Sequence, residues 1–409
     1  MTHPDAAVSP NAFHHRAFLL YWIARLFASF AVQIVVVAIG WKVYALTSDP
    51  FALGLVGLME FMPSVVLVLF TGAVADRFER RLIVSACLAL ELLCVIGFFA
   101  HGWVGAREVL PIYGLLLVLG VARAFLGPSL QAMVPNMVPR VALSSAVSWT
   151  SASWQVATIG GPVVGGLLFG LSEFVAYGTA IAMFVLGIAL MLALPMVPQT
   201  ARQGESTWDS VSAGFRYVFT NRIVLGAISL DLFAVLLGGA VALMPVYAKD
   251  ILVLGPLGLG LLRSAPGIGA IAVTLWLATF PIKSAAGLKM FAGVGLFGLG
   301  TLVFGISTSP ALSIAMLALM GAGDMVSVYV RETLIQLATP DDVRGRVSAV
   351  NMVFVGASNE LGEFRAGTMA ALIGVIPAVV VGGVGTMLVA FAWAAMFPEL
   401  RKAERLDGS

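Results

Sequence analysis

Long apolar stretches recur along this chain, and each is about as long as a bilayer is thick. A membrane-spanning helix needs about 20 predominantly apolar residues. Dividing the sequence at charged residues, prolines and glycine-rich points gives twelve such stretches. A β-barrel is excluded, because barrel strands are about 10 residues of alternating polarity. We expect spanning helices at roughly 18–45, 52–75, 82–101, 110–133, 143–170, 174–195, 223–247, 257–280, 288–307, 310–333, 347–372 and 376–397.

The composition requires that much of the surface face lipid. Of the 409 residues, 60% are hydrophobic and 11% are charged, whereas a soluble domain carries about 25% charged residues. The net charge is only +2 and no basic block contains interleaved aromatic residues, so we do not expect nucleic-acid binding. Four histidines and two cysteines leave little for a metal site. We expect neither a metal nor another cofactor.

One long polar linker divides the chain into halves of similar length. The sequence predicts an N-terminal six-helix bundle at 1–196, a cytoplasmic linker at 197–222, and a C-terminal six-helix bundle with a cytoplasmic tail at 223–409. The stretch Gly120–Arg123 matches Gly321–Asp324, which indicates a repeat of about 200 residues. Two parallel six-helix halves with a substrate path between them are a transporter architecture.

Lysine and arginine are unevenly distributed between the two ends of the expected helices. With the N-terminus inside, fifteen of them lie in the inner loops and tails, and only Arg107 and Lys249 lie in the outer loops. Positively charged loops stay in the cytoplasm. We therefore expect both termini to be cytoplasmic.

The loop after the second expected span carries the strongest local motif, Gly72–Arg81. A glycine lets two helices approach closely, an aspartate can accept from backbone or arginine donors, and arginines hold the loop at the anionic inner leaflet. The alternative is an ordinary positive loop. The spacing G-x-x-x-D-R-x-x-R-R resembles the signature loop of the major facilitator superfamily, and this resemblance implies a gating role for Gly72, Asp76, Arg77, Arg80 and Arg81.

Two further motifs agree with that resemblance. Arg123–Gly127 in the fourth span resembles the R-x-x-x-G element of the family, and Gly160–Gly166 in the fifth resembles the glycine-proline motif of its exporters. Proline removes a backbone donor and glycine removes a side chain. We expect Gly161, Pro162 and Gly165 to let this helix pack tightly and bend against a neighbour in the other half. A lipid-facing kink is the alternative.

The inner loop Thr339–Val347 narrows the resemblance. It is similar to a T-P-x-x-x-R-G-R-V loop in the branch of the superfamily that includes enterobactin and drug exporters, and it contains Arg344 and Arg346. The resemblance implies proton-driven efflux from the cytoplasm across a bacterial-type inner membrane. It also implies conformational roles for these two arginines and for Arg123 and Asp324, which occupy matched positions in the fourth and tenth spans. It does not name a substrate.

Ionisable residues inside spans are costly enough to be functional candidates. Asp231 lies near the middle of the seventh span, and Glu60 lies eight residues from the outer end of the second. We expect Asp231, with Glu60 as second choice, to carry the coupling proton, and Arg25 to be a partner. The alternative for each of these residues is a structural ion pair without a role in transport. For Glu91 in the third span, a structural role is the favoured interpretation. Snorkelling would explain the cations nearer span ends: Lys42, Arg263 and Arg331.

Aromatic and acidic residues of several spans are candidates to line a substrate path. Most of the aromatic ones could equally pack against other helices or face lipid. The candidates are Tyr21, Phe30, Phe61, Trp154, Phe233, Glu360 and Glu363.

Together these features predict an all-α membrane protein of twelve transmembrane helices in two pseudo-symmetric six-helix bundles. We expect a monomeric, proton-coupled exporter of a small organic molecule such as a drug or siderophore, whose partners are substrate, protons and lipid. An importer or facilitator of the same fold is one alternative. A polytopic membrane enzyme or a non-transporting scaffold is another, although the sequence has no catalytic cluster. An ATP-driven pump is excluded, because the chain has no phosphate-binding loop.

Overall fold

The computed structural model describes residues 11–195 and 207–404, and within these ranges the regular structure is helical. The first six long helices are α1 (Arg16–Thr47), α2 (Pro50–Arg77), α3 (Arg80–Trp103), α4 (Leu110–Met137), α5 (Leu143–Leu171) and α6 (Glu173–Leu192). The later ones are α7 (Thr207–Thr220), α8 (Arg222–Gly238), α10 (Gly255–Thr279), α11 (Ala286–Ile306), α12 (Pro310–Ala338), α13 (Asp341–Ile373) and α14 (Val375–Met396). The short elements are η1 (Ala12–His14), η2 (Arg140–Ala142), η3 (Val241–Leu243), α9 (Met244–Val246), η4 (Tyr247–Ile251) and α15 (Pro398–Arg401).

Eleven segments of the described chain are long and apolar enough to cross a membrane. They coincide with the predicted spans except the eleventh, which corresponds to α13. This helix has 33 residues, or about 50 Å of length, so it is long enough to span. Its interior carries Glu360, Glu363 and Arg365, which lower its hydropathy below that of the others. These charges are the reason that α13 is the least apolar of the twelve spanning helices.

The chain forms two compact units, Met1–Ile39 with Met59–Gly204 and Gly40–Leu58 with Glu205–Ser409. The hairpin between α1 and α2 therefore belongs to unit 2. Its Phe51 ring lies 6.0 Å from that of Phe364 in α13, and a Cβ on Gly54 would lie 3.0 Å from the Phe364 carbonyl oxygen. The predicted division into two bundles on either side of the central linker stays a prediction.

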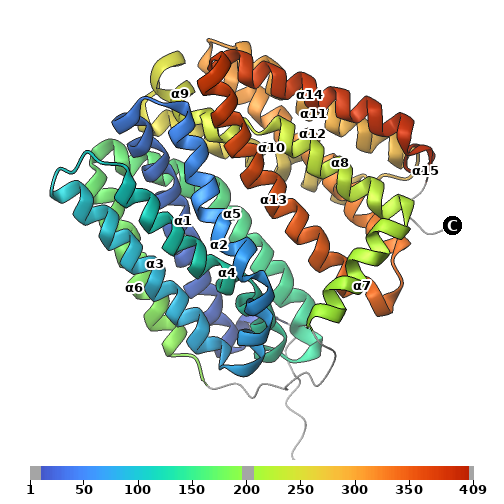
Figure 1. The fold of residues 1–409 in the computed structure, drawn as a ribbon. Helices are drawn as coiled ribbons and strands as arrows, with labels where there is room; N and C mark the ends of the chain where they lie inside the picture. The colour runs from blue at the N-terminus through green and yellow to red at the C-terminus, as the bar shows by residue number, and fades with distance from the viewer. Residues whose placement is uncertain (1–10, 196–206, 405–409) are drawn as a thin grey trace, which may run out of the picture. The chain divides into compact units, whose positions relative to one another are not determined.

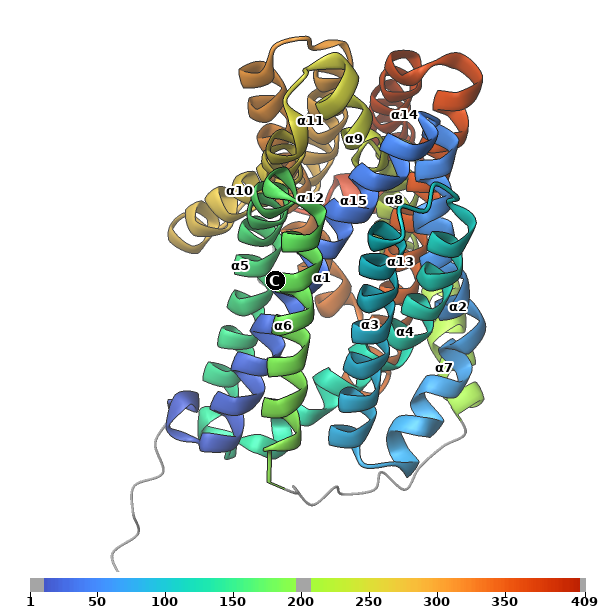
Figure 2. The same ribbon diagram turned by 90° about the vertical axis from the view of Figure 1, so that its left-hand side faces the viewer.

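Unit 1 is built around α3, which packs on α4 and α6. Figure 2 shows α3 and α6 running side by side. Buried aromatic residues fill the contact, including Phe98 and Tyr177, whose rings stack at 6.2 Å. The contact leaves one face of α3 for its buried polar residues, including Glu91.

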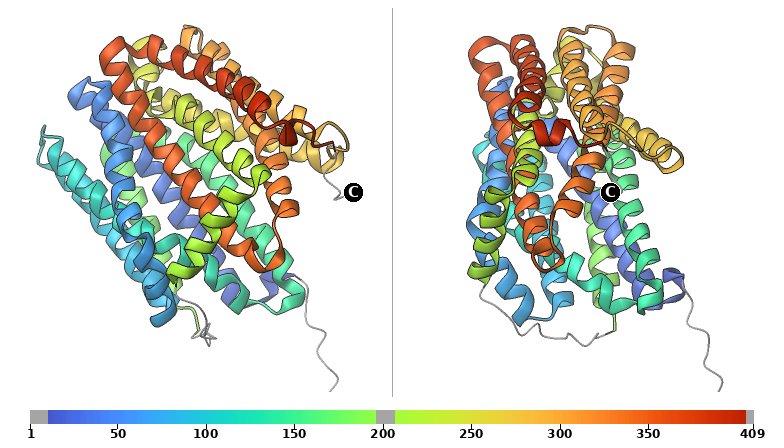
Figure 3. Two further views of the ribbon diagram at one scale, coloured as in Figure 1. Left: turned by 45° about the vertical axis from the view of Figure 1, so that its right-hand side comes forward. Right: turned by 90° about the vertical axis from the view of Figure 1, so that its right-hand side faces the viewer.

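Unit 2 has two groups of packed helices. In one, α11 packs on α12 and α14 and α10 packs on α12 (Figure 1). In the other, α13 lies beside α8, as both views of Figure 3 show. The first amides of α11 donate to the end of the described chain, with Gly287 N 2.9 Å from Ala403 O. This contact ties the C-terminal segment to α11.

Helix α7 lies inside the linker that the sequence analysis treated as polar connection, so that expectation was incomplete. It packs on α13 and α8. A Cβ on Gly214 would lie 2.8 Å from the Arg346 carbonyl oxygen, and the Phe215 ring lies 6.0 Å from that of Phe354. The close approach at Gly214 and the ring contact fix the position of α7 on α13.

The seventh span is not one continuous helix. Helix α8 ends at Gly238, and the chain continues through η3, α9 and the π-helical turn η4. Side chains satisfy the carbonyls at the break: Arg365 donates to Leu236 O at 2.7 Å and to Leu237 O at 2.5 Å, and Thr386 donates to Ala234 O at 2.9 Å. Backbone inside a membrane tolerates such a break only when its polar groups find partners in the protein.

Candidate functional site

A buried ion pair joins α8 and α12 in unit 2. Arg331 Nη1 donates to Asp231 Oδ1 at 2.5 Å, and the two residues are 4% and 6% exposed. Both side chains are buried, so each charge faces the other rather than lipid. Such a pair is favourable only while both partners are present.

A second acid lies next to this pair. Asp324 precedes Arg331 by seven residues on α12, or about 10 Å along the axis, and therefore lies on the same face. Asp231, Asp324, Ser327 and Arg331 form the polar part of a small pocket that is otherwise lined by Ala234, Val235, Val294 and Phe297. The Arg331 guanidinium pairs with Asp231, and Asp324 interacts electrostatically with both of them. An arrangement of this kind can hold a proton, because a single cation cannot neutralise two carboxylates.

Unit 1 contains a comparable cluster. Arg123 on α4 forms an ion pair with Glu60 on α2, and its Nε lies 3.8 Å from Oε1 of Glu91 on α3. Gly120 stands one turn before Arg123, and a Cβ there would meet the main-chain carbonyl of Glu60. The missing side chain lets α2 and α4 come close enough for the pair to form.

Arg25, which the sequence offers as a partner of Asp231, has other contacts within unit 1. Arg25 Nη1 donates to the hydroxyl of Tyr21 at 3.1 Å, and that hydroxyl donates to Leu130 O at 3.0 Å. Its pairing with Asp231 stays a prediction. The expectation that Arg331 snorkels was wrong, because Arg331 is buried against Asp231. Lys42, another expected snorkelling residue, is buried too. Distance from a helix end does not reveal which face a side chain occupies.

The predicted path acids of α13 face a third cation. Arg263 on α10 interacts electrostatically with Glu363 and Glu360. A Cβ on Gly57 would lie 2.9 Å from Glu360 Oε2 and 3.2 Å from Glu363 Oε2, so this glycine leaves room for both carboxyls. The structure therefore brings these two residues together, as their spacing of three residues on a helix predicts.

The aromatic candidates differ in burial and in their neighbours. Tyr21 is fully buried, Phe30 packs against Gly160, and Phe61 is partly exposed. Trp154 and Phe233 are 48% and 40% exposed. The Phe233 ring lies 5.1 Å from that of Trp393, and Tyr21 contacts Phe18. Their role in a substrate path stays a prediction.

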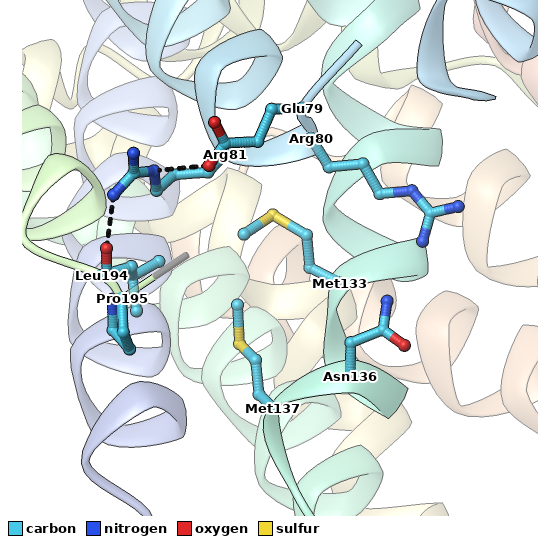
Figure 4. Close-up of a pocket in the computed structure, with 8 residues that line it drawn as sticks. All are labelled: Glu79, Arg80, Arg81, Met133, Asn136, Met137, Leu194 and Pro195. Carbon is cyan, nitrogen blue, oxygen red and sulfur yellow. Dashed lines mark hydrogen bonds and ion pairs between the residues drawn. The ribbon is translucent and has the colours of Figure 1, made fainter. Parts of the chain in front are cut away.

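The loop arginines bind carbonyl groups within unit 1 (Figure 4). Arg81 Nη1 donates to Leu194 O at 2.5 Å and its Nε lies 2.9 Å from Glu79 Oε1. Arg80 extends in the opposite direction and donates to Ala132 O at 2.9 Å. The two arginines thus attach the start of α3 to the ends of α6 and α4. Gly72, Asp76 and Arg77 lie on the last turns of α2, and their side chains are outside the described part.

The remaining gating candidates also find neighbours in their own unit. Gly161 and Gly165 on α5 lie against Gln33 and Ile34 of α1, so these glycines allow close packing of α5 on α1 within unit 1. Pro162 between them is buried. Arg344 pairs with Asp341 at 2.5 Å and donates to Thr339 O at 3.2 Å. The Arg346 main chain lies under α7.

Sequence reasoning did not assign a site role to Arg331, Glu91, Arg365 or Arg263. Each is a charged residue within a predicted span, and this position alone could have marked it as a candidate. In the described residues, no group of three or more His, Cys, Asp or Glu side chains is placed to hold a metal ion.

Comparison with known proteins agrees with this architecture. The family described as "Transmembrane secretion effector" matches residues 6–408. An enterobactin exporter, EntS of Shigella dysenteriae serotype 1, is 25% identical over 395 residues, which are 95% of this chain and 93% of the relative.

Solved transporter structures share the fold. A nucleoside transporter, NupG, superposes with a TM-score of 0.68 and 16% identity over 93% of this chain and 99% of its own. A POT family transporter in complex with a thioalcohol-conjugated peptide superposes with a TM-score of 0.74 and 12% identity, over 94% of this chain and 96% of its own. The predicted twelve-helix fold is confirmed.

Proposed function

Because this chain belongs to the transmembrane secretion effector family of the major facilitator superfamily, we propose that it exports a small organic molecule from the cytoplasm in exchange for protons. The protein is a multi-pass membrane transporter and not an enzyme. A siderophore or a drug-like molecule is the proposed substrate class, and the similarity to an enterobactin exporter supports it. We propose that it is a monomer in a bacterial inner membrane. Fifteen basic residues in the inner loops and tails against two in the outer loops support cytoplasmic termini.

The buried Asp231–Arg331 pair beside Asp324 carries this proposal. A proton-coupled transporter needs a carboxyl whose proton affinity changes when its surroundings change. Asp231 would become neutral when it takes up a proton, and its contact with Arg331 would then weaken. Arg331 could turn to Asp324 without becoming an unpaired charge. The change of partner would connect the proton to the packing of α8 on α12.

The Glu60–Arg123 pair is the second proton candidate. It joins α2 to α4 as the first pair joins α8 to α12. Each unit therefore contains one cation between two acids, which supports a role in coupling for both.

An efflux assay with Asp231→Asn tests the proposal. Cells that contain the protein are loaded with enterobactin or ethidium, and efflux is followed with and without a protonophore. Wild-type efflux should stop when the protonophore is added. Asp231→Asn imitates the protonated acid, so it should lose gradient-driven efflux but keep exchange of labelled for unlabelled substrate. The control Glu108→Gln alters an exposed carboxyl and should behave as wild type.

Two outcomes would contradict the proposal. Wild-type efflux that is insensitive to the protonophore would exclude proton coupling. If Asp231→Asn still concentrates substrate outside with normal pH dependence, Asp231 is structural, and Glu60→Gln becomes the next variant to measure.

A further inference from the structure

Glu91 is a buried acid that the proposed mechanism does not use. It lies in the middle of α3 with 0% of its surface exposed. In the described part of the structure, neither of its carboxyl oxygens accepts a hydrogen bond. The cation nearest to it is Arg123, whose Nε is 3.8 Å from Oε1.

Arg123 lies between Glu91 and Glu60. Its Nη1 forms the ion pair with Glu60, so Glu91 has only the longer contact. With both acids ionised, the cluster would carry one net negative charge inside the membrane. An ionised carboxylate without hydrogen bonds is very costly in an apolar environment and becomes neutral by taking a proton.

Few other groups could stabilise a charge on Glu91. Cys87 and Cys94 lie on the same face of α3 and interact electrostatically with it. Helix α4 contributes Arg123, and α2 contributes Glu60. Helix α6 also packs on α3, but its only titratable residues are Glu173 and Tyr177 in its first turns. Among the described residues of these elements, Arg123 is the positive group that has an ion-pair contact with Glu91.

We propose that Glu91 and Glu60 share one proton and that Arg123 exchanges between them. In this structure Arg123 binds ionised Glu60, and the proton is on Glu91. In the alternate state the proton has passed to Glu60, and Arg123 binds ionised Glu91. The cluster is neutral in both states, and Arg123 always has a negative partner.

This exchange makes Glu91 a positioning residue for the coupling acid. Glu60 can become neutral without leaving Arg123 as an unpaired buried charge. The inference rests on the proposed proton coupling for its role in transport, but the proton on Glu91 can be measured without transport.

Infrared spectroscopy of the purified protein tests the shared proton. Protonated carboxyls absorb in a separate C=O region, and difference spectra of wild type against each variant isolate single groups. Wild type minus Glu91→Gln should contain the band of one protonated carboxyl. Wild type minus Glu60→Gln should contain the same band, because in that variant Arg123 pairs with Glu91, which ionises and loses the band. Glu108→Gln, an exposed acid, should change nothing in this region.

Transport provides the second measurement. Glu91→Gln removes the second partner of Arg123, so Glu60 should become neutral only in more acidic medium. The pH dependence of efflux should therefore shift by about one unit or more towards acidic pH. Glu91→Asp keeps the carboxyl and should restore much of the normal dependence.

The possible results separate this inference from the proposed function. A band that remains in Glu60→Gln but is absent from Glu91→Gln would make Glu91 an isolated, structural acid and overturn the exchange. An unchanged spectrum in Glu91→Gln, or an unchanged pH dependence, would also overturn it. Efflux that is insensitive to a protonophore would overturn the proposed function instead. The infrared spectra would still test the shared proton independently of transport.

Discussion

Buried acids and their cationic partners decide how this transporter could couple to protons. Asp231 and Glu60 were predicted from their depth in the sequence, and the structure gives each an arginine, Arg331 and Arg123. Removing one member of a buried pair leaves a charge without compensation, and this costs about 3–5 kcal/mol of stability. The pair is therefore a point where charge and packing are linked.

Arg331→Ala should lower the stability of the purified protein by about 3–5 kcal/mol, because Asp231 then stays buried without its partner. Asp231→Asn combined with Arg331→Ala removes both charges and should recover most of the melting temperature. Efflux should stay absent in both. Melting measured by tryptophan fluorescence in detergent compares the three proteins. A single variant as stable as wild type would mean that the pair is not an important packing contact.

The sequence could predict which residues are charged inside the membrane, but not their partners. Hydropathy reports how long and how apolar a helix is, whereas pairing depends on how the helix is rotated about its axis. Asp231 was therefore found while its partner was assigned to Arg25, and Arg331 was expected to reach the interface. The same limit left Glu91 without a role.

Individual helices show where local sequence rules succeed and fail. Most helix starts and ends agree with the hydropathy pattern within a few residues, because lipid imposes a length on each span. The exceptions are the end of α8 at Gly238 and the start of α13 at Asp341. The break in the seventh span follows Gly238 and Gly239 and is held by Arg365 on another helix. Helix α7 was missed because it is short and lies in a polar stretch, and its packing on α13 cannot be seen in the sequence. Both features depend on contacts between distant segments.

Arg365→Ala should destabilise unit 2 at the break. The carbonyls of Leu236 and Leu237 would lose their donors, and each unsatisfied buried group costs about 1–3 kcal/mol. Arg365→Lys supplies a cation with different geometry and should give an intermediate melting temperature. Arg222→Ala, which removes an exposed pair with Glu399 and an exposed hydrogen bond to Met396 O, is the control and should have little effect. Equal melting temperatures for Arg365→Ala and Arg222→Ala would show that the hydrogen bonds from Arg365 are not needed to stabilise the break.

Two glycines on α4 provide a matched test of helix packing. A methyl group on Gly120 would collide with the main chain of Glu60, whereas the space around Gly127 is open. Gly120→Ala should lower the melting temperature and separate Glu60 from Arg123. Gly127→Ala should be neutral or stabilise by about 0.5–1 kcal/mol, because alanine favours the helix. Similar effects of the two variants would contradict the close approach of α2 and α4.

At the scale of the whole molecule, the proposed orientation in the membrane rests on the basic residues of the loops. Val104 is 79% exposed in the loop between α3 and α4, and Lys402 is exposed after α15. Val104→Cys should react with an impermeant thiol reagent in intact cells, and Lys402→Cys should react only after the membrane is opened. The native cysteines, Cys87 and Cys94, are buried and should give little background. Labelling of Lys402→Cys from outside would reverse the orientation.

Proton movement driven by substrate in proteoliposomes tests the central claim most directly. Wild-type protein is reconstituted with a pH-sensitive dye inside the vesicles, and a gradient of enterobactin or ethidium is applied without a pH gradient. For antiport through Asp231, protons should move against the direction of substrate and change the internal pH. Asp231→Asn should exchange substrate with no change in internal pH. Substrate movement by the wild type without any proton flux, or an unaltered flux in Asp231→Asn, would contradict the account.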